Sequence, residues 1–316
     1  MKILVTGGAG FIGSHLCEQL CEQKHDVVCI DNLFTSRREN ISHLLKRSNF
    51  EFHRHDVCEP WNIECDVVFH LACPASPVQY QRNPVNTIKT AVIGTLNALE
   101  CARNANSKIV IASTSEVYGD PQVHPQVESY VGHVNPIGKR ACYDEGKRAG
   151  EALAVSWAQQ YKTDIRIARI FNTYGPRMAH DDGRLIPNFI MQAMRKEPLT
   201  VYGDGRQTRS FCYVTDTVRG LILLSEMERD RMKVPVVNIG NPDERSILSV
   251  AKDVQSAFDY APDLISLPLP EDDPRQRCPD ITLAKTILGW EPKIDYVDGI
   301  VHTVAWFREF VDPKLT

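Results

Sequence analysis

The sequence has no long hydrophobic run and no large excess of charge of either sign. None of its apolar stretches approaches the roughly 18–20 residues that a membrane-spanning helix needs. The opening segment "MKILVTGGAG" leads straight into a predicted strand and lacks the apolar core and cleavage site of a signal peptide. A net charge of -4 also provides no basic surplus for nucleic acid. These absences predict a cytoplasmic protein that contacts neither membrane nor nucleic acid.

The ten cysteines follow neither a metal-binding nor a disulfide pattern. No C-x-x-C pair occurs, and the spacings are irregular. Cys17 and Cys21 lie one helical turn apart, but ordinary packing explains this spacing better than zinc. We therefore expect reduced, buried thiols, as in most cytoplasmic proteins, and no metal site.

Short runs rich in β-branched residues alternate with longer helical patterns in the first half of the chain. The runs are mostly apolar, which is typical of parallel strands covered by helices on both faces. Right-handed crossovers would make such a sheet doubly wound. The runs cover residues 2–6, 26–30, 51–56, 66–72, 108–113 and 164–170, and the clearest helical segments cover 85–104 and 141–161.

After about residue 172 this alternation ends, and proline and glycine interrupt the sequence. The change predicts an α/β protein with two parts, a doubly wound parallel sheet of the Rossmann type and a smaller C-terminal substrate domain. We assign residues 1–172 and 210–240 to the Rossmann domain, because the second segment returns to a helix followed by the strand-like run "VVNIG". Residues 173–209 and 241–316 form the predicted substrate domain. A chain of 316 residues is long enough for both.

The motif "TGGAGFIGSH" at residues 6–15 follows the first predicted strand and opens a helix. Gly7, Gly10 and Gly13 permit a tight turn and let backbone amides approach a pyrophosphate at the helix N-terminus. Asp31 ends the next strand, where it would accept hydrogen bonds from the adenosine ribose and repel a 2′-phosphate. The pattern predicts NAD rather than NADP. A glycine turn without a ligand is the alternative.

Two neighbouring features leave alternatives open. Arg37 and Arg38 lie close to Asp31 in the sequence and would attract the 2′-phosphate of NADP. Asp56 and Val57 end the third predicted strand, where they fit a contact with adenine and fit a plain strand end nearly as well.

Three side chains able to handle protons, Thr114, Ser115 and Glu116, come in a row where the run at 108–113 ends. A strand end is where an open α/β sheet places its chemistry. Capping of a turn or helix by Ser115 and Glu116 is the alternative.

Tyr143 and Lys147 form the pattern Y-x-x-x-K in a predicted helix, which places both side chains on one face. A cationic lysine and a positively charged nicotinamide would lower the pKa of the phenol. Tyr143 would then take a proton from a substrate hydroxyl while hydride leaves the same carbon. With 10 tyrosines in the chain the pattern alone arises easily by chance. Its position after a glycine loop and a hydroxyl-bearing strand end favours catalysis.

Together with "RIFNTYGPR", these motifs resemble the extended short-chain dehydrogenases/reductases that modify nucleotide sugars, and the resemblance covers nearly the whole chain. Within that family the resemblance is greatest to the UDP-glucuronate decarboxylases (UDP-xylose synthases). The segments that carry it are "HLACPASP" (70–77), "NPIGKRACYDEGKR" (135–148), "VYGDGRQTRSF" (201–211) and "DDPRQRCPD" (272–280).

The resemblance gives a meaning to Ser115. The 4,6-dehydratases of the family carry Thr-Asp-Glu at this strand end, where the Asp helps to expel water from C6. Here the middle residue is Ser115, and glucuronate has no C6 hydroxyl to expel. Oxidation at C4 would turn the C5 carboxylate into that of a β-keto acid, which loses CO2 readily; C5 is then protonated and C4 reduced again. The resemblance therefore implies conversion of UDP-glucuronate to UDP-xylose with one NAD used and regenerated in each turnover.

Three other functions stay open at this point. A related nucleotide-sugar 4-epimerase or 4,6-dehydratase shares the first oxidation step with a decarboxylase. A non-catalytic NAD-binding regulator has the same scaffold but would be expected to lose Tyr143 or Lys147, and both are present.

The resemblance also implies roles for individual residues. Tyr143 acts as acid and base at O4, Lys147 tunes it, Thr114 lies near O4, and Ser115, Glu116 and Arg277 complete the catalytic set. NAD is expected to contact Gly7, Gly10, Phe11, Ile12, Gly13, Asp31, Asn32, Phe34, Thr35, Asp56, Val57, Leu71, Cys73, Thr90, Ala112, Tyr143, Lys147 and Thr173. Cys73 stands where a serine is common in the family, and we do not interpret its thiol as a nucleophile.

A sugar-nucleotide diphosphate favours arginine, because the planar guanidinium donates two parallel hydrogen bonds. The second domain includes Arg177, Arg184, Arg206, Arg209, Arg275 and Arg277. The resemblance places Arg209 and Arg277 at the diphosphate or the sugar carboxylate. The expected substrate-binding residues are Lys89, Asn172, Arg184, Asn188, Tyr202, Arg209 and Arg277.

The helices at 84–104 and about 141–161 carry more apolar surface than one sheet covers. Ile88, Val92, Leu96 and Leu99 form a stripe at helical spacing, which Ile93, Ala102, Ala149, Leu153 and Trp157 extend. The family commonly pairs these helices across a two-fold axis, so the resemblance implies a homodimer with a four-helix bundle at its interface. Burial of these residues within one subunit is the alternative.

Overall fold

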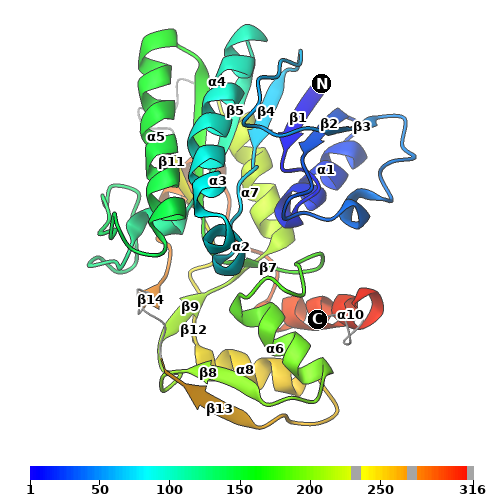
Figure 1. Ribbon diagram of the computed structural model, residues 1–316, viewed down its shortest axis with the longest axis vertical. Helices are drawn as coiled ribbons and strands as arrows, with labels where there is room; N and C mark the ends of the chain where they lie inside the picture. The colour runs from blue at the N-terminus through cyan, green and yellow to red at the C-terminus, as the bar shows by residue number, and fades with distance from the viewer. Residues whose placement is uncertain (229–235, 269–275, 312–316) are drawn as a thin grey trace.

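A seven-stranded parallel sheet forms the centre of the computed structural model, which describes residues 1–228, 236–268 and 276–311. The strand order is β11-β6-β5-β4-β1-β2-β3 (Figure 1). Each predicted run coincides with a strand to within two residues at either end. The strands are β1 (Lys2–Thr6), β2 (Asp26–Asp31), β3 (Phe50–Arg54), β4 (Val67–His70), β5 (Lys108–Thr114), β6 (Asp164–Ile170) and β11 (Val236–Ile239). The predicted doubly wound parallel sheet is confirmed.

Helices cover both faces of this sheet (Figure 1). One face carries α3 (Pro84–Lys89), a π-helical turn η2 (Thr90–Gly94), α4 (Thr95–Asn104) and α5 (Ala141–Tyr161), and the other carries α1 (Phe11–Glu22) and α7 (Val214–Glu226). The strands can therefore be apolar throughout, because each face is buried under helices. One core cluster lies on the face of α4 and α5, and a larger one lies on the face of α1 and α7 and continues into the elements after residue 172.

The turn η2 and the helix α5 approach each other closely at two glycines. A Cβ atom on Gly150 would lie 3.1 Å from the carbonyl oxygen of Ala91, and one on Gly146 would lie 3.0 Å from the Cβ of Ala91. This close approach places the first turns of α5, with Tyr143 and Lys147, beside the end of β5.

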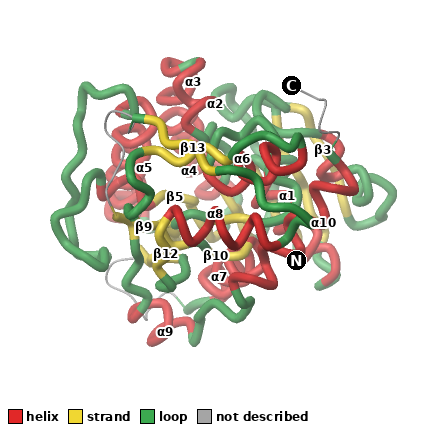
Figure 2. The backbone as a smooth tube through the Cα atoms, turned by 90° about the horizontal axis from the view of Figure 1, so that it is seen from below, coloured by secondary structure: helices red, strands yellow, loops and turns green. Residues whose placement is uncertain are grey.

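Short strands and helices after residue 172 build a second group of elements below the sheet (Figures 1 and 2). Two strands, β8 (Leu199–Tyr202) and β13 (Leu264–Leu267), pair in parallel beside α6 (Leu185–Met194) and α8 (Ile247–Ser256). A three-stranded sheet has the order β12 (Glu244–Ser246), β9 (Thr208–Ser210) and β14 (Gln276–Arg277). The other short elements after residue 172 are β7 (Thr173–Tyr174), β10 (Cys212–Tyr213), α9 (Thr282–Leu288) and α10 (Tyr296–Phe310). Three further elements come earlier in the chain: the helix α2 (Pro77–Arg82) and the 3-10 turns η1 (Arg38–Ile41) and η3 (Ser115–Tyr118).

The domain bounds drawn from the sequence stay a prediction, since the elements do not separate strictly along them. Helix α9 packs against β11 and α7, although it belongs to the segment assigned to the substrate domain. Just after α9, the indole of Trp290 donates a hydrogen bond to the carbonyl oxygen of Asp216. Residues 229–235, 269–275 and 312–316, and with them Arg275 and parts of both predicted domains, lie outside the described residues.

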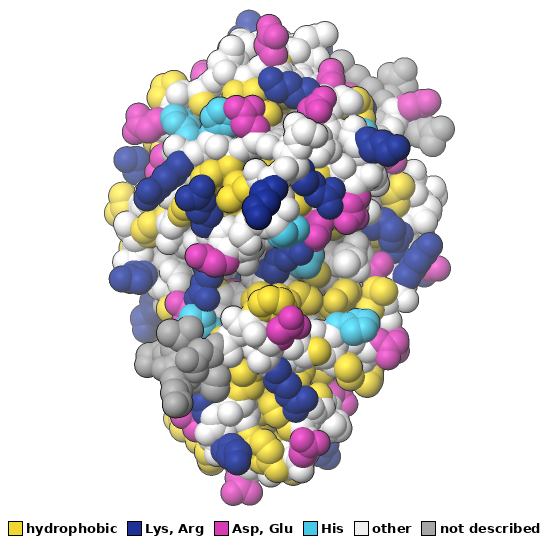
Figure 3. Space-filling view, turned by 90° about the vertical axis from the view of Figure 1, so that its right-hand side faces the viewer, with side chains coloured by type: hydrophobic (Ala, Val, Ile, Leu, Met, Phe, Trp, Pro, Cys, Tyr) yellow, Lys and Arg dark blue, Asp and Glu magenta, His cyan; other side chains and the backbone are white. Residues whose placement is uncertain are grey.

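The state of the cysteines and the distribution of surface charge are as the composition predicts. All ten cysteines are free thiols, and seven of them are buried. In the described part of the chain, no helix combines the length and hydropathy that crossing a bilayer requires. Basic and acidic side chains are interspersed over the face shown in Figure 3.

Candidate active site

A cavity of about 990 Å³ lies where the carboxyl ends of the central strands meet the second group of elements. The strand order reverses between β1 and β4, and in open α/β sheets the crevice at such a point binds the ligand. One side of the cavity is lined by the β1–α1 loop and the ends of β2 and β5. The other is lined by residues of α6, β8, β9 and β14.

Glycines shape the β1–α1 loop at one end of this cavity. Gly7 has a φ of +71°, and a Cβ there would lie 2.8 Å from the backbone nitrogen of Ala72. A Cβ on Gly13 would lie 2.1 Å from the carbonyl oxygen of Gly7. The loop therefore keeps α1 tightly against β1, with Phe11 and Ile12 of the first helical turn lining the cavity. This helix N-terminus suits the pyrophosphate of a dinucleotide.

Asp31 ends β2 and faces the same part of the cavity. One carboxylate oxygen accepts a hydrogen bond from the Ala9 amide at 3.0 Å. The other accepts from the Leu33 amide at 2.9 Å and the Ser36 hydroxyl at 2.6 Å. These bonds fix the carboxylate where ribose hydroxyls could reach it. Arg37, which also lines the cavity, forms an ion pair with Asp181 at 3.1 Å.

Most of the expected cofactor residues line this cavity, and Asp56 does not. The side-chain amide of Asn32 donates a hydrogen bond to Asp56 at 3.0 Å. Burial alone would raise the pKa of Asp56, but hydrogen bonds from the Cys58 amide and from Asn32 outweigh it and lower the pKa. The lining residues are Gly7, Gly10, Phe11, Ile12, Gly13, Asp31, Asn32, Phe34, Thr35, Val57, Leu71, Cys73, Thr90, Ala112, Tyr143, Lys147 and Thr173.

Tyr143 and Lys147 lie side by side at the end of β5. The Thr114 hydroxyl lies near enough to the Tyr143 hydroxyl to lower the pKa of the phenol. The Lys147 ammonium donates a hydrogen bond to the carbonyl oxygen of Ala112 at 2.7 Å. Burial, and next the nearby Cys73 thiol, raise the pKa of Tyr143 above its ordinary value. In the protein alone, desolvation of the phenolate dominates and Lys147 donates to a backbone carbonyl. The lowering of this pKa beside the positively charged nicotinamide of NAD+ stays a prediction.

Glu116 lies between two guanidinium groups. It pairs with Arg140 and, at 3.4 Å, with Arg277, which also donates a hydrogen bond to the carbonyl oxygen of Ser115. Burial would raise the pKa of Glu116, but the charges of Arg277 and Arg140 lower it to about 2. Glu116 is therefore ionised at neutral pH and has no proton to donate.

The sequence analysis missed three residues of this site. Tyr80 and Arg140 line the cavity, and Asp144 lies behind them. Burial, and next the charge of Glu116, raise the pKa of Asp144 well above its ordinary value. Arg140 and Asp144 flank Tyr143 in the quoted segment "NPIGKRACYDEGKR", but only the folded chain shows that they face Glu116.

Six of the seven expected substrate-binding residues line the cavity, and Lys89 does not. Asn172, Arg184, Asn188, Tyr202, Arg209 and Arg277 line the cavity. Arg184 forms an ion pair with Asp182, and Arg177 pairs with Glu18 at 2.6 Å. Lys89 is exposed, and neither it nor Arg206, whose side chain is 87% exposed, lines the cavity.

Cys73 lines the cavity near Tyr143, and burial raises the pKa of its thiol. A thiol that holds its proton is a poor nucleophile. The charge of Lys147 acts against this rise but does not outweigh it. That Cys73 is not a nucleophile stays a prediction.

The cavity combines an elongated anion and ribose site with a buried tyrosine–lysine pair and several arginines. This arrangement suits oxidation and reduction at a carbon that carries a hydroxyl, on a substrate with negative charge.

Comparison with known proteins agrees with this chemistry. Residues 3–240 match the model of the NAD dependent epimerase/dehydratase family. The chain is 54% identical over 311 residues to UDP-glucuronic acid decarboxylase 2 of Arabidopsis thaliana, covering 98% of this chain and 69% of the relative. It is 50% identical over 308 residues to UDP-glucuronic acid decarboxylase 1 of Xenopus tropicalis, covering 98% and 72%.

Solved structures show the same fold at lower identity. The UDP-glucuronic acid 4-epimerase of Bacillus cereus, in complex with UDP-glucuronic acid and NAD, has a TM-score of 0.87 and 30% identity, with 98% of this chain and 99% of that chain covered. A dTDP-glucose 4,6-dehydratase of Streptomyces venezuelae with NAD bound has a TM-score of 0.88 and 26% identity, with 98% of each chain covered.

Proposed function

The chain belongs to the NAD dependent epimerase/dehydratase family, and from this membership we propose that it is an NAD-dependent decarboxylase that converts UDP-glucuronate to UDP-xylose and CO2. One observation carries the proposal: the relatives named as UDP-glucuronic acid decarboxylases are at least 50% identical along nearly the whole chain. The epimerase and dehydratase structures described above are far less similar in sequence.

The β1–α1 loop, Asp31 and Lys147 would hold NAD. The tight loop around Gly7 and Gly13 and the buried carboxylate of Asp31 fit a dinucleotide with free ribose hydroxyls. Bound NAD+ supplies the acceptor for hydride from C4 of the sugar and returns it at the end of the turnover.

Tyr143 is the proposed acid and base at O4. It takes the proton of the O4 hydroxyl as C4 is oxidised and gives it back as C4 is reduced. Because burial raises the pKa of Tyr143, the phenolate needs positive charge close by. The charge of Arg184 already lowers this pKa, and the buried Lys147 ammonium lies one helical turn further along α5. The Thr114 hydroxyl lies near the Tyr143 hydroxyl and would help to orient the phenol toward O4.

The arginines would hold the carboxylate of the sugar. Arg140 and Arg277 face Glu116, and Arg209 adds a third positive charge near it. Asp144 lies 3.9 Å from Arg140, but its raised pKa reduces its negative charge, so the cluster keeps an attraction for a second carboxylate. Once C4 is a ketone, the carbon–carboxylate bond breaks and its electrons move into the ketone, forming an enolate and CO2. The enolate then takes a proton from solvent water at C5, in place of the lost carboxylate.

Ser115 and Glu116 at the end of β5 are unsuited to a dehydration reaction. Ser115 is buried and lines the cavity at a position where a dehydratase would need a carboxylic acid. Glu116 is held ionised by its arginine partners and cannot protonate a leaving hydroxyl at neutral pH.

The test is to incubate the purified protein with UDP-glucuronate and NAD+ and to follow the nucleotide sugar by mass spectrometry. A UDP-pentose with release of one CO2 per sugar supports decarboxylation. A product that has lost water instead of CO2 would identify a dehydratase, and no conversion at all would favour a non-catalytic NAD-binding protein.

The second candidate is a C4 epimerase of UDP-glucuronate. The B. cereus epimerase, solved with UDP-glucuronic acid and NAD, is similar in fold over the whole chain. Its reaction keeps the carboxylate, so the product would have the mass of the substrate but a different retention time. Formation of a UDP-pentose decides between the two.

We also propose a homodimer. On the outer surface of α3 and α5, Val85 is 67% exposed and Ile88 39% exposed, and Ala149 and Ala152 are exposed beside them. Leu96 and Leu153 are half-buried, whereas Leu99, Ala102 and Trp157 are buried within the subunit. The exposed residues support an interface of these helices with their copies.

A further inference from the structure

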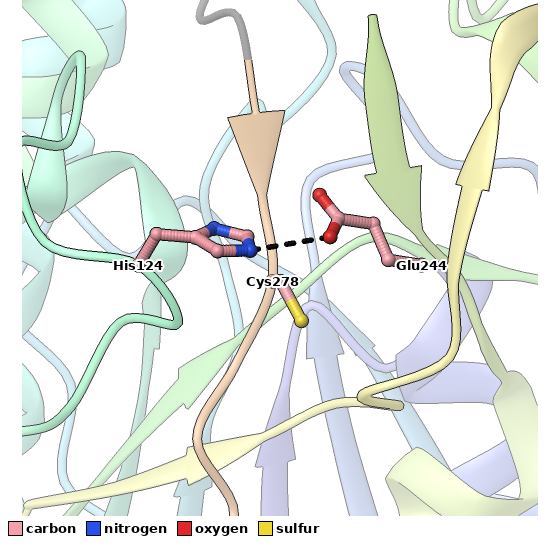
Figure 4. A group of neighbouring side chains, drawn as sticks. All are labelled: His124, Glu244 and Cys278. Carbon is pink, nitrogen blue, oxygen red and sulfur yellow. Dashed lines mark ion pairs between the residues drawn. The ribbon is translucent and has the colours of Figure 1, made fainter.

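Three side chains with metal-binding atoms lie together outside the cavity: His124, Glu244 and Cys278 (Figure 4). The imidazole Nε2 of His124 lies 3.2 Å from a carboxylate oxygen of Glu244. The ligand atoms of all three residues lie within 4.8 Å of one another. None of the three lines the cavity of the proposed active site. The cluster therefore needs an explanation of its own.

Backbone hydrogen bonds hold the three segments in place. Glu244 begins β12 and Cys278 directly follows β14, and both strands pair with β9. The segment of His124 is tied to that of Cys278 through Gln126, whose amide donates to the Cys278 carbonyl at 2.8 Å and whose side chain accepts from the Cys278 amide at 2.9 Å. The ligand atoms are thus brought together without further ordering of the chain.

The donor set and the distances suit zinc. Zinc binds imidazole nitrogen, carboxylate oxygen and thiolate sulfur at about 2.0–2.3 Å, which places tetrahedral ligands about 3.3–3.8 Å apart. The ligand atoms here lie within 4.8 Å of one another. Side-chain rotations that move them by roughly 1 Å would bring them to the separations of a tetrahedral zinc site. The Thr208 hydroxyl donates a hydrogen bond to Glu244 and would orient its carboxylate, as partners of metal ligands commonly do.

Access and charge also favour a cation. The side chains of His124 and Glu244 are 32% and 24% exposed, so an ion can enter from solvent and keep a water molecule, while Cys278 lies buried beneath them. Asp280 adds negative potential near the Cys278 sulfur, whereas the charge of Asp243 is compensated by its ion pair with Arg245 at 2.8 Å. Glu244 contributes a further negative charge at the same place.

We propose that His124, Glu244 and Cys278 bind one Zn2+ ion, with solvent water as the fourth ligand. As the sulfur–zinc bond forms, the thiol releases its proton to solvent and gives up its hydrogen bond to the Pro242 carbonyl, which is 3.4 Å away. Cys278 directly follows Arg277, so the ion ties the His124 segment and β12 to the strand that carries this arginine. The sequence alone hides the site, because its three donors come from segments far apart in the chain.

The proposal is tested on the full chain without an affinity tag, freed of metal and kept reduced. Titration with Zn2+ by calorimetry should give one site per chain, and excess Zn2+ should raise the melting temperature. Co2+ in place of Zn2+ should give the absorption bands of a tetrahedral thiolate complex. Cys278→Ser should abolish the thiolate band, and Cys278→Ser and His124→Ala should each weaken Zn2+ binding by more than about tenfold.

Two matched controls come from the same chain. His53 pairs with Glu51 at 2.9 Å on β3, and Cys58 is a half-buried thiol, but neither belongs to the cluster. His53→Ala and Cys58→Ser should leave the site and the cobalt spectrum unchanged. Absence of saturable Zn2+ binding by the wild-type chain, or equal binding by Cys278→Ser and His124→Ala, would overturn the proposal and leave His124 and Glu244 as an ion pair only. None of these measurements depends on turnover of a nucleotide sugar.

Discussion

The rings of Tyr80 and Tyr143 lie face to face, with their centroids 5.1 Å apart and their planes 1° apart. Tyr80 belongs to α2, whose first turn is capped by the Ser76 hydroxyl. Its side chain is 1% exposed, so it is held by packing on all sides. A stack of this kind restricts the rotation of Tyr143 and keeps its hydroxyl near Thr114. We infer that Tyr80 positions the proposed acid and base.

Removing the stack should lower turnover more than binding. For Tyr80→Ala we expect kcat to fall by about tenfold or more, since small misplacements of a reacting group are enough for such a loss. The KM for UDP-glucuronate should change much less. Tyr80→Phe keeps the ring and should keep most of the activity. Equal losses in both variants would point to the Tyr80 hydroxyl rather than to the stack.

Replacing the proposed base has a larger expected effect. Tyr143→Phe removes the hydroxyl without changing the shape of the ring, and we expect turnover to fall by about 10²–10⁴-fold. Binding of NAD and UDP-glucuronate, measured by calorimetry, should persist. Tyr161→Phe, at the exposed end of the same helix, is the control and should behave as wild type. Release of CO2 by Tyr143→Phe at the wild-type rate would show that another group is the base.

Local sequence patterns predicted the parts of the site that come from single segments. The end of β1 with its glycine loop, Asp31 at the end of β2 and the Tyr143–Lys147 pair on one helix each follow from spacing within a short stretch. The contacts of Glu116 do not, because Arg277 reaches it from β14 and Arg140 from the segment before α5. Tyr80 was missed for the same reason. Its α2 is short, and nothing in its sequence indicates that it faces α5.

The lowered pKa expected for Tyr143 depends on more than the spacing of Tyr143 and Lys147. The i, i+4 spacing places Lys147 on the same helix face as Tyr143. It does not predict which group the Lys147 ammonium hydrogen-bonds or how deeply the Tyr143 hydroxyl is buried. In the fold the ammonium meets the Ala112 carbonyl, and burial disfavours the phenolate.

Cofactor preference tests the role of Asp31. Its carboxylate is buried and accepts three hydrogen bonds from the protein. Asp31→Asn keeps the shape but removes the charge that would repel a 2′-phosphate, so NAD should bind more weakly and its advantage over NADP should shrink. Titrations of both cofactors into wild type and variant measure this. Equal affinity of the wild type for NAD and NADP would contradict the assignment.

The ion pairs of Glu116 predict a pH-dependent stability. Its pKa lies at about 2 in the folded protein, against an ordinary value of 4.5, so the stabilisation is complete above pH 4.5 and is lost as the pH falls toward 2. Glu116→Gln leaves the buried Arg277 with less compensation, and we expect a loss of about 2–3 kcal/mol in the free energy of unfolding at pH 7. Urea unfolding of both proteins at pH 7 and pH 3 should show the difference shrinking at the lower pH. A difference independent of pH would mean that packing, not charge, holds Glu116.

The proposed homodimer can be tested on the exposed apolar residues of α3. Light scattering at micromolar concentration should give about twice the 35.7 kDa mass of one chain. Ile88→Arg adds a charge to the proposed interface without entering the core, since the side chain is already 39% exposed, and should yield monomers. Val301 on α10 is 50% exposed and lies away from α3 and α5, so Val301→Arg should leave the dimer intact. Because like charges would face each other across a two-fold axis, the effect of Ile88→Arg should weaken at high salt. A monomeric wild-type protein with full activity would refute the dimer and leave this apolar surface without a partner.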